Sequence, residues 1–358
     1  MKKIIAILPG DGIGPEIMNE AIKVLDVIAD KFKHTWIYKH GFIGGSAWDD
    51  FGNHFPDETK EICENSDAIL FGSVGGPASQ IMEPRWKGSE INAVLGIRKH
   101  FNFNINLRPS KVYPSLAEQC VLRSDIVRKG IDILTVRELS SGIYFGEHKT
   151  VEENGQKVAY DTMTYDEKTI ESITHTAFKF AMARGKKVSS IDKANVLDCS
   201  KLWREVVDRV AVEYPKVTLE HVFVDNCVMQ LLQRPWEFDV ILTSNMFGDI
   251  ISDETSVFAG SLGMLPSASI NSNGFAMYEP SGGSAPDIAG RNIANPIAQI
   301  LSAAMMLKYS FNLHEEHDAI LQAIDTVLKK GGRTVDIVAG ANETLSTSQM
   351  GDMICEYI

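Results

Sequence analysis

The stretch IESITHTAFKFAMARGKKVSSI, residues 170–191, decides the fold class. Apolar side chains recur at helical spacing over 170–181, and Gly185 ends the pattern. Residues 188–191 then have the short apolar character of a strand. The segment therefore predicts a helix that leads into a strand, which is the repeating unit of α/β proteins.

The same alternation continues outward from this stretch in both directions. Downstream, a helix is expected to begin near Ser200 with one apolar face, and strands at 221–224 and 238–243 are each followed by a helical pattern. Toward the chain ends we expect strands at 3–8 and 67–71 and helices from about Pro15, near 294–308 and near 315–329. The chain is therefore predicted to be an α/β protein with two lobes, in which helices cover mixed sheets.

A different pattern interrupts the alternation at residues 142–165. This segment is rich in aromatic and β-branched residues around the turn sequence Glu152-Glu153-Asn154-Gly155, which predicts a β-hairpin. Because an isolated hairpin is barely stable in water, we expect this arm, residues 140–165, to pair with another chain.

The overall charge limits the possible partners. The 358 residues carry a formal net charge of −12, which disfavours general binding to nucleic acid or to an anionic membrane. Any anionic ligand must therefore be bound by local arginines. A lysine-rich apolar run opens the chain, but Asp11 and Pro15 interrupt it, so we expect neither a signal peptide nor a membrane span there.

The cysteines indicate a reducing environment. There are five of them, widely spaced and without a CxxC or Cys/His pattern that could bind zinc, namely Cys63, Cys120, Cys199, Cys227 and Cys355. We therefore expect a cytoplasmic protein without structural disulfides.

The first motif that suggests a ligand is GDGIGPE, residues 10–16. It follows a predicted strand and opens a predicted helix, and Asp30 lies at about the spacing of an acid that contacts a ribose. However, Pro15 stands where the Rossmann fingerprint has its last glycine. A tight turn with Pro15 in the first turn of a helix explains the same residues and is favoured.

The second motif is NMFGDIISDE, residues 245–254. Asp249 and Asp253 are four residues apart and therefore share one face of a helix, where bare carboxylates repel each other. A divalent cation converts that repulsion into attraction, and carboxylate oxygens suit Mg²⁺ or Mn²⁺. The alternative is a solvated acidic face without a ligand.

Six motifs together carry a family resemblance. In chain order they are GDGIGPE, GIRKHFNFNINLRP (96–109), TVRELSSGIYFG (135–146), VSSIDKANVLD (188–198), NMFGDIISDE and GSAPDIAG (283–290). This set resembles the β-decarboxylating dehydrogenases, which include isopropylmalate, isocitrate, homoisocitrate and tartrate dehydrogenases. The resemblance implies a cofactor-binding domain at 1–104 and 260–358, and a second domain at 105–259 with a metal site, the dimer interface and the hairpin arm.

The resemblance also assigns roles to individual residues. It implies that Arg98, Arg108 and Arg137 bind the substrate carboxylates, which suits the bidentate geometry of guanidinium groups. Tyr144 and Lys193 correspond to the acid/base pair. The metal ligands are implied to be Asp225, Asp249 and Asp253, with Lys193 and Asp225 contributed by the neighbouring subunit of a homodimer.

The cofactor end of the site is implied by the segment 283–290 and its surroundings. The residues expected to bind the cofactor are Gly283, Ser284, Ala285, Pro286, Asp287, Ile288, Asn295 and Glu279. Asp287 can accept hydrogen bonds from ribose hydroxyls and repels a 2′-phosphate, so NAD is expected rather than NADP. Relatives that use NADP carry lysine and tyrosine at positions 287 and 288. One departure is Gly282, where the family usually has histidine.

The residues before Arg98 indicate the substrate. Isocitrate-type relatives place serine and asparagine six and four residues before that arginine, whereas this chain has Asn92 and Val94. Val94, Leu95 and, from the partner chain, Val196 can enclose an isopropyl group. Glu90 lies eight residues before the arginine, where the family's glutamate lies seven before it.

The expected reaction is therefore NAD-dependent oxidative decarboxylation of 3-isopropylmalate, a step of leucine biosynthesis. The alternatives are another 2-hydroxy dicarboxylate, such as tartrate, malate or homoisocitrate, and a regulatory subunit without turnover. The chain retains Tyr144, Lys193 and the three aspartates, which argues against a regulatory subunit.

Overall fold

The computed structural model describes residues 1–338 and 343–358 and divides the chain into two compact units. The first unit comprises residues 1–102, 113–121 and 259–358, and the second comprises 103–112 and 122–258. Residues 113–121, which the sequence analysis assigned to the second domain, group with the first unit.

The first unit contains a mixed sheet in the order β2 (Thr35–His40), β1 (Lys2–Gly10), β3 (Ala68–Ser73), β12 (Ala276–Pro280) and β11 (Pro266–Ile270). All neighbouring strands are parallel except β11 and β12, which are antiparallel. Every residue of β3 and β12 is buried, as expected for strands covered on both faces. The strands predicted at 3–8 and 67–71 are thereby confirmed.

Four long helices pack together in this unit: α1 (Gly14–Phe32), α10 (Ile297–Tyr309), α11 (His314–Lys329) and α12 (Thr347–Glu356). The residues of α10 from Ile297 to Leu307 are all buried, which explains why that segment is apolar on every side. The shorter helices α2 (Gly45–Phe51), α3 (Asp57–Glu64) and α4 (Gly96–His100) lie near the start of the chain, and a π-helical turn at Ile91–Leu95 precedes α4. The helices predicted near 294–308 and 315–329 are confirmed.

The strands of the second unit lie in the order β4 (Ile105–Lys111), β5 (Asp132–Glu138), β10 (Val240–Thr243), β8 (Lys187–Asp192) and β9 (Thr218–Phe223). β4 is antiparallel to β5, and the remaining pairs are parallel. Its helices are α5 (Ser124–Val127), α6 (Glu167–Met182), α7 (Asp198–Ala211), α8 (Val224–Gln233) and α9 (Asn245–Ser256). The helix and strand predicted from residues 170–191 are α6 and β8.

The cores of α6 and α7 follow the predicted apolar faces. Ile170, Ile173, Ala177, Phe178 and Ala181 of α6 are buried, and Asp166 caps the helix by accepting a hydrogen bond from Thr169 N–H. The buried residues of α7 are Ser200, Trp203, Val206, Val207 and Val210. Local periodicity therefore determined both helices correctly.

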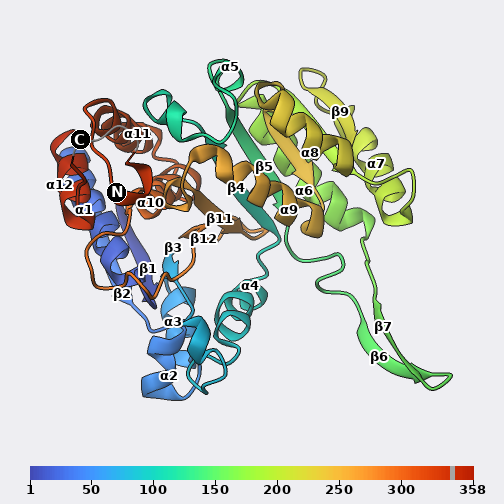
Figure 1. Ribbon diagram of the computed structural model, residues 1–358, viewed down its shortest axis with the longest axis horizontal. Coiled ribbons are helices and arrows are strands. Elements are labelled where there is room, and N and C mark those ends of the chain that lie inside the picture. Colours follow the sequence, from blue (N-terminus) through green and yellow to red (C-terminus); the bar gives the residue numbers. More distant parts are fainter. Residues whose placement is uncertain (339–342) are drawn as a thin grey trace. The chain divides into compact units, whose positions relative to one another are not determined.

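The predicted hairpin is present as β6 (His148–Glu153) and β7 (Gln156–Asp161), which pair antiparallel. Asn154 and Gly155 form the turn with φ angles of 52° and 75°, as a type I′ turn requires. All but one of the strand residues are exposed, and the hairpin projects from the rest of its unit (Figure 1). Its pairing with another chain remains a prediction. No helix among the described residues is long and apolar enough to cross a membrane.

Candidate functional site

The acidic face of α9 gathers several of the predicted site residues. Arg137, at the end of β5, donates from Nη1 to Oδ1 of Asp249 at 2.5 Å. The hydroxyl of Tyr144 donates to the other oxygen, Oδ2, at 3.0 Å. Arg137 is buried whereas the Asp249 side chain is 35% exposed, so the carboxylate lies at the boundary between core and solvent. The structure thus brings together a predicted metal ligand, Asp249, a predicted substrate-binding arginine, Arg137, and Tyr144 of the predicted acid/base pair.

Arg108 reaches the same face from the neighbouring strand. It donates from Nη1 to Ser252 Oγ at 2.7 Å, and the same nitrogen lies 3.4 Å from Asp253 and 3.9 Å from Asp249. Register explains the convergence, because Asn106 of β4 pairs with Arg137 of β5 and Arg108 lies two residues further along the same face of its strand. Two guanidinium groups therefore face two carboxylates within the second unit.

The environment of Tyr144 keeps its phenol protonated. Burial raises the pKa of Tyr144, and the charge of Asp249 and the hydrogen bond to it raise the pKa further. The side chain remains 45% exposed. A neutral phenol that is open to solvent can donate a proton to a ligand beside it.

Lys193 and Asp225 form a second cluster in this unit. Lys193 Nζ lies 3.1 Å from Asp225 Oδ2, and the hydrogen bond from Lys193 lowers the pKa of Asp225. The strand predicted at 221–224 begins and ends earlier in the structure, as β9. β9 ends at Phe223, and Asp225 lies in the first turn of α8. Ser200 Oγ accepts the backbone N–H of Lys193 at 3.1 Å and so holds the start of its loop.

The described residues, 1–338 and 343–358, contain no group of three His, Cys, Asp or Glu side chains that could hold a metal ion. Asp249 and Asp253 share one face of α9, whereas Asp225 lies on α8 against Lys193. The sequence analysis expected Asp225 to come from the neighbouring subunit of a homodimer. That assignment remains a proposal.

Within the first unit, Arg98 of α4 pairs with Glu279 of β12 at 2.8 Å. Both side chains are largely buried, with 15% and 10% exposed. The predicted carboxylate-binding arginine therefore contacts a predicted cofactor residue. Val94 lies in the π-helical turn and is half-buried, and Leu95 is 43% exposed. Val196, in the second unit, is 63% exposed, so all three predicted apolar side chains present surface to solvent.

The GDGIGPE turn and the loop expected to bind the cofactor meet in the first unit. Ile13 N–H donates to Ser284 O at 2.8 Å, and a Cβ at Gly12 would lie 1.9 Å from that oxygen. The GDGIGPE turn therefore packs directly on the GSAPDIAG segment. Pro15 lies in the first turn of α1, as the favoured interpretation predicted, and Asp30 lies inside α1 and not after a second strand, as the Rossmann fingerprint would require.

Sequence reasoning missed one organising residue here, Asp11. Its carboxylate is 5% exposed and accepts backbone N–H groups from Gly45 at 2.9 Å, Ser46 at 2.8 Å and Gly75 at 3.2 Å. Burial raises the pKa of Asp11 although these N–H groups favour its charged form. The sequence shows that Asp11 lies in GDGIGPE, but it does not show which distant N–H groups its carboxylate binds.

The predicted cofactor residues in and after the GSAPDIAG segment differ in their exposure to solvent. Ala285 has a positive φ of 39°, and Ile288 N–H donates to its carbonyl at 3.1 Å, which forms a tight turn. Asp287 on this turn is exposed, as a ribose contact requires. Asn295, in contrast, is buried, and its Nδ2 donates to Asp336 at 3.0 Å. Gly282 has open space around it, since a Cβ there would lie 3.9 Å from the nearest atom, on Leu262.

These features define the class of protein to which the chain belongs. It is a member of the isocitrate/isopropylmalate dehydrogenase family, whose model matches residues 4–354.

Individual relatives are similar over nearly their whole length. The chain is 54% identical over 355 residues to 3-isopropylmalate dehydrogenase of Haemophilus influenzae, covering 99% of each protein. It is 53% identical over 354 residues to 3-isopropylmalate dehydrogenase of Thermotoga maritima, covering 99% of this chain and 98% of the relative.

Solved structures agree on the fold. Isocitrate dehydrogenase from Methylococcus capsulatus superposes with a TM-score of 0.85 at 30% identity over 99% of both chains. A β-decarboxylating dehydrogenase from Thermococcus kodakarensis superposes with a TM-score of 0.80 at 34% identity, covering 99% of this chain and 96% of that one. The predicted family and α/β fold are thereby confirmed.

Proposed function

We propose that the chain catalyses the NAD-dependent oxidative decarboxylation of 3-isopropylmalate to 4-methyl-2-oxopentanoate and CO₂ in leucine biosynthesis. The observation that supports this most is the convergence of Arg108, Arg137 and Tyr144 on the two aspartates of α9. The names of relatives that are 53–54% identical support the particular substrate.

The arginines bind the dianionic substrate. Arg108 and Arg137 come from adjacent strands and present their guanidinium groups at one edge of α9. They satisfy a substrate carboxylate through charge-assisted hydrogen bonds, which are stronger than neutral ones. Arg98 contributes a third guanidinium, which Glu279 orients.

Lys193 and Tyr144 move the protons. Lys193 receives the proton of the C2 hydroxyl as C2 loses its hydride, and the 2-keto acid then loses the carboxyl group on C3 as CO₂. Tyr144 returns a proton to C3. Its position beside Asp249 and its raised pKa keep the phenol protonated until that step.

The chain's residues fit the two groups that this chemistry needs. Asp225, Asp249 and Asp253 offer only carboxylate oxygens, the donors that Mg²⁺ and Mn²⁺ prefer. When bound, the cation would supply Lewis acidity to the reacting substrate, and NAD⁺ would accept the hydride. The exposed Asp287 accepts the ribose hydroxyls of NAD and disfavours the 2′-phosphate of NADP.

The working unit is a homodimer with shared active sites. Lys193 and Asp225 pair with each other at 3.1 Å, whereas Tyr144 and Asp249 form a separate pair. Each site then combines the α9 face of one subunit with the Lys193 cluster of the other. The exposed hairpin β6–β7 supplies pairing surface for the same assembly.

The test is the formation of NADH by the purified protein, followed by absorbance, with 3-isopropylmalate, NAD⁺ and Mn²⁺ or Mg²⁺. Isocitrate, malate and tartrate are assayed in parallel. We expect kcat/KM to be highest for 3-isopropylmalate and activity to disappear with a chelator and return with the metal. Higher efficiency with another of these acids would assign the site to that substrate instead.

A further inference from the structure

We propose that Asn245 is a positioning residue that holds Tyr144 and Arg137 in their working places. It is the first residue of α9 and is 1% exposed. The inference rests on the proposed roles of Tyr144 as the proton donor and Arg137 as a substrate ligand.

The amide oxygen of Asn245 fixes the guanidinium of Arg137. Oδ1 accepts from Nε at 3.0 Å and from Nη2 at 2.8 Å, which occupies one edge of the guanidinium. Nη1 is then directed to Asp249 at 2.5 Å. A neutral amide holds Arg137 in this orientation without placing a second negative charge beside it.

The amide nitrogen of Asn245 holds the loop that carries Tyr144. Nδ2 donates to the carbonyl of Ser141 at 3.0 Å, three residues before the tyrosine. The N–H of Ser141 in turn donates to Oε2 of Glu138 at 2.9 Å, and Glu138 is fully buried. Ser141 is therefore held through both its carbonyl and its N–H, and this fixes the start of the Tyr144 loop.

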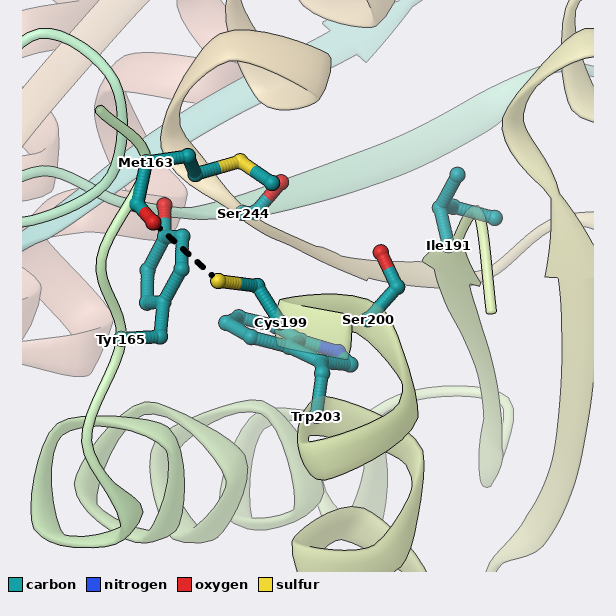
Figure 2. Close-up of a pocket in the computed structure, with 7 residues that line it drawn as sticks. All are labelled: Met163, Tyr165, Ile191, Cys199, Ser200, Trp203 and Ser244. Carbon is teal, nitrogen blue, oxygen red and sulfur yellow. Dashed lines mark hydrogen bonds between the residues drawn. The ribbon is translucent and has the colours of Figure 1, made fainter. Parts of the chain in front are cut away.

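Tyr165 holds the backbone of Asn245. Its hydroxyl accepts the backbone N–H of Asn245 at 2.8 Å, and its ring packs edge-on against Trp203 at 5.6 Å between centroids. Tyr165 lines a cavity of about 10 Å³ with Met163, Cys199 and Ser244, which has room for about one water molecule (Figure 2). Asn245 is thus hydrogen-bonded to a buried side chain of the same unit.

The Tyr144 loop also rests on Tyr165 directly. Gly142 N–H donates to Thr164 O at 3.0 Å, and a Cβ at Gly142 would lie 2.5 Å from the Tyr165 hydroxyl. The loop, α9 and Arg137 therefore share one anchor, Asn245. A displacement of about 1 Å in an acid or a substrate ligand can lower a rate by about 100-fold, so such an anchor can control turnover.

The chemistry of the anchor favours asparagine over its isosteric acid. An aspartate keeps the acceptor for Arg137 but places a carboxylate oxygen against the carbonyl of Ser141, where the amide now donates. Asn245→Asp therefore retains the volume and one of the two side-chain functions. Asn245→Ala removes both functions.

The experiment is a double-mutant cycle on the complete enzyme with 3-isopropylmalate, NAD⁺ and Mn²⁺. It compares the unaltered chain, Asn245→Asp, Asn245→Ala, Tyr144→Phe and the combination of each Asn245 change with Tyr144→Phe. Asn65→Ala is the matched control, because Asn65 is an exposed asparagine that also donates to a backbone carbonyl.

Where Tyr144 is kept, we expect each Asn245 change to lower kcat about 10- to 100-fold. In the Tyr144→Phe background, the same change should lower kcat much less. KM for 3-isopropylmalate should rise more for Asn245→Ala than for Asn245→Asp, because only alanine removes the Arg137 contact. If Asn245→Ala does not fold, the isosteric Asn245→Asp pair completes the cycle. Circular dichroism verifies the fold of each variant.

Three outcomes overturn the inference, and they distinguish its failure from that of the proposed function. Equal losses of kcat in both backgrounds, or no loss from Asn245→Asp, mean that Asn245 contributes stability without positioning Tyr144. If Tyr144→Phe alone leaves kcat unchanged, the proposed role of Tyr144 fails, and the inference that depends on it fails with it.

Discussion

Tyr144 and Arg137 hold opposite oxygens of one carboxylate, Asp249, at 3.0 and 2.5 Å. The phenol donates to Oδ2 and the guanidinium to Oδ1. Asp249 therefore links the proposed proton donor, a proposed substrate ligand and the proposed metal site. A change at this carboxylate should affect all three functions together, which makes it the most informative position to alter.

Asp249→Asn should remove most turnover and weaken the metal requirement while the fold survives. The amide is a poor ligand for Mg²⁺ or Mn²⁺, and the loss of a group in the immediate surroundings of a metal lowers affinity about 10- to 100-fold or more. Asp249 is partly exposed, so its change affects the core little. Metal titration of activity is the measurement, with Asp198→Asn as the control because Asp198 is 94% exposed and pairs with Lys201. An unchanged titration curve with full activity would show that Asp249 is not a ligand.

Replacing Asp287 with lysine and Ile288 with tyrosine should shift preference from NAD toward NADP. The change removes a charge that repels the 2′-phosphate and adds partners for it. Asp287 is exposed on its turn, so the fold should tolerate the change. We expect the ratio of kcat/KM for the two cofactors to move by at least about tenfold. A constant ratio would place the ribose contact at another residue.

Changing Val94 to asparagine and Leu95 to serine should affect substrates differently. We expect 3-isopropylmalate to lose about 1 to 3 kcal/mol in transition-state binding, because an isopropyl group gains from apolar surface. Malate lacks that group and should lose much less. The measurement is kcat/KM for both acids. Equal losses would indicate that the change disturbs Arg98, which lies in the following helix.

Gly12→Ala should disrupt the packing of the GDGIGPE turn against the loop proposed to bind the cofactor. Gly12 has a φ of 59°, and the added Cβ would lie 1.9 Å from the Ser284 carbonyl oxygen. The loops must separate, so KM for NAD should rise by at least about tenfold. Gly52→Ala is the matched control, because Gly52 also has a positive φ, 62°, but a Cβ there meets nothing within 4 Å. Similar effects from both changes would contradict this account.

Asp67→Asn should reduce stability in a pH-dependent way. Burial opposes the charge of Asp67, but Ile4 N–H at 2.7 Å and Lys3 at 2.8 Å outweigh it and hold the pKa of Asp67 below its usual range. A lowered pKa in the folded state adds stability above the unfolded pKa, and this is lost as pH falls through the folded pKa.

At pH 7 we expect Asp67→Asn to lower the free energy of unfolding by about 1 kcal/mol. This value is modest because the Asp67 side chain is 34% exposed. The difference between the two proteins should shrink below about pH 4. Urea unfolding at several pH values measures it, with the exposed Asp50→Asn as control. A difference that stays constant down to pH 2 would rule out the ion pair as its cause.

The sequence by itself determined the helices and strands, because their apolar periodicity is local. The pattern of residues 170–191 was sufficient to predict α6 and β8, and Asn154-Gly155 was sufficient to predict the turn of the hairpin. Spacing also placed Asp249 and Asp253 on one helical face, since four residues make about one turn. The residue types of the site could therefore be predicted.

Only the tertiary structure decided which of these side chains meet. Arg137 and Asp249 are 112 residues apart in sequence, and Arg98 and Glu279 are 181 apart. Their contacts depend on strand order and register, which local patterns do not encode. The same holds for Asn245, whose hydrogen bonds reach three residues, Arg137, Ser141 and Tyr165. A buried amide must satisfy its polar atoms somewhere, but only the packing of β5, α9 and the Tyr144 loop selects its partners.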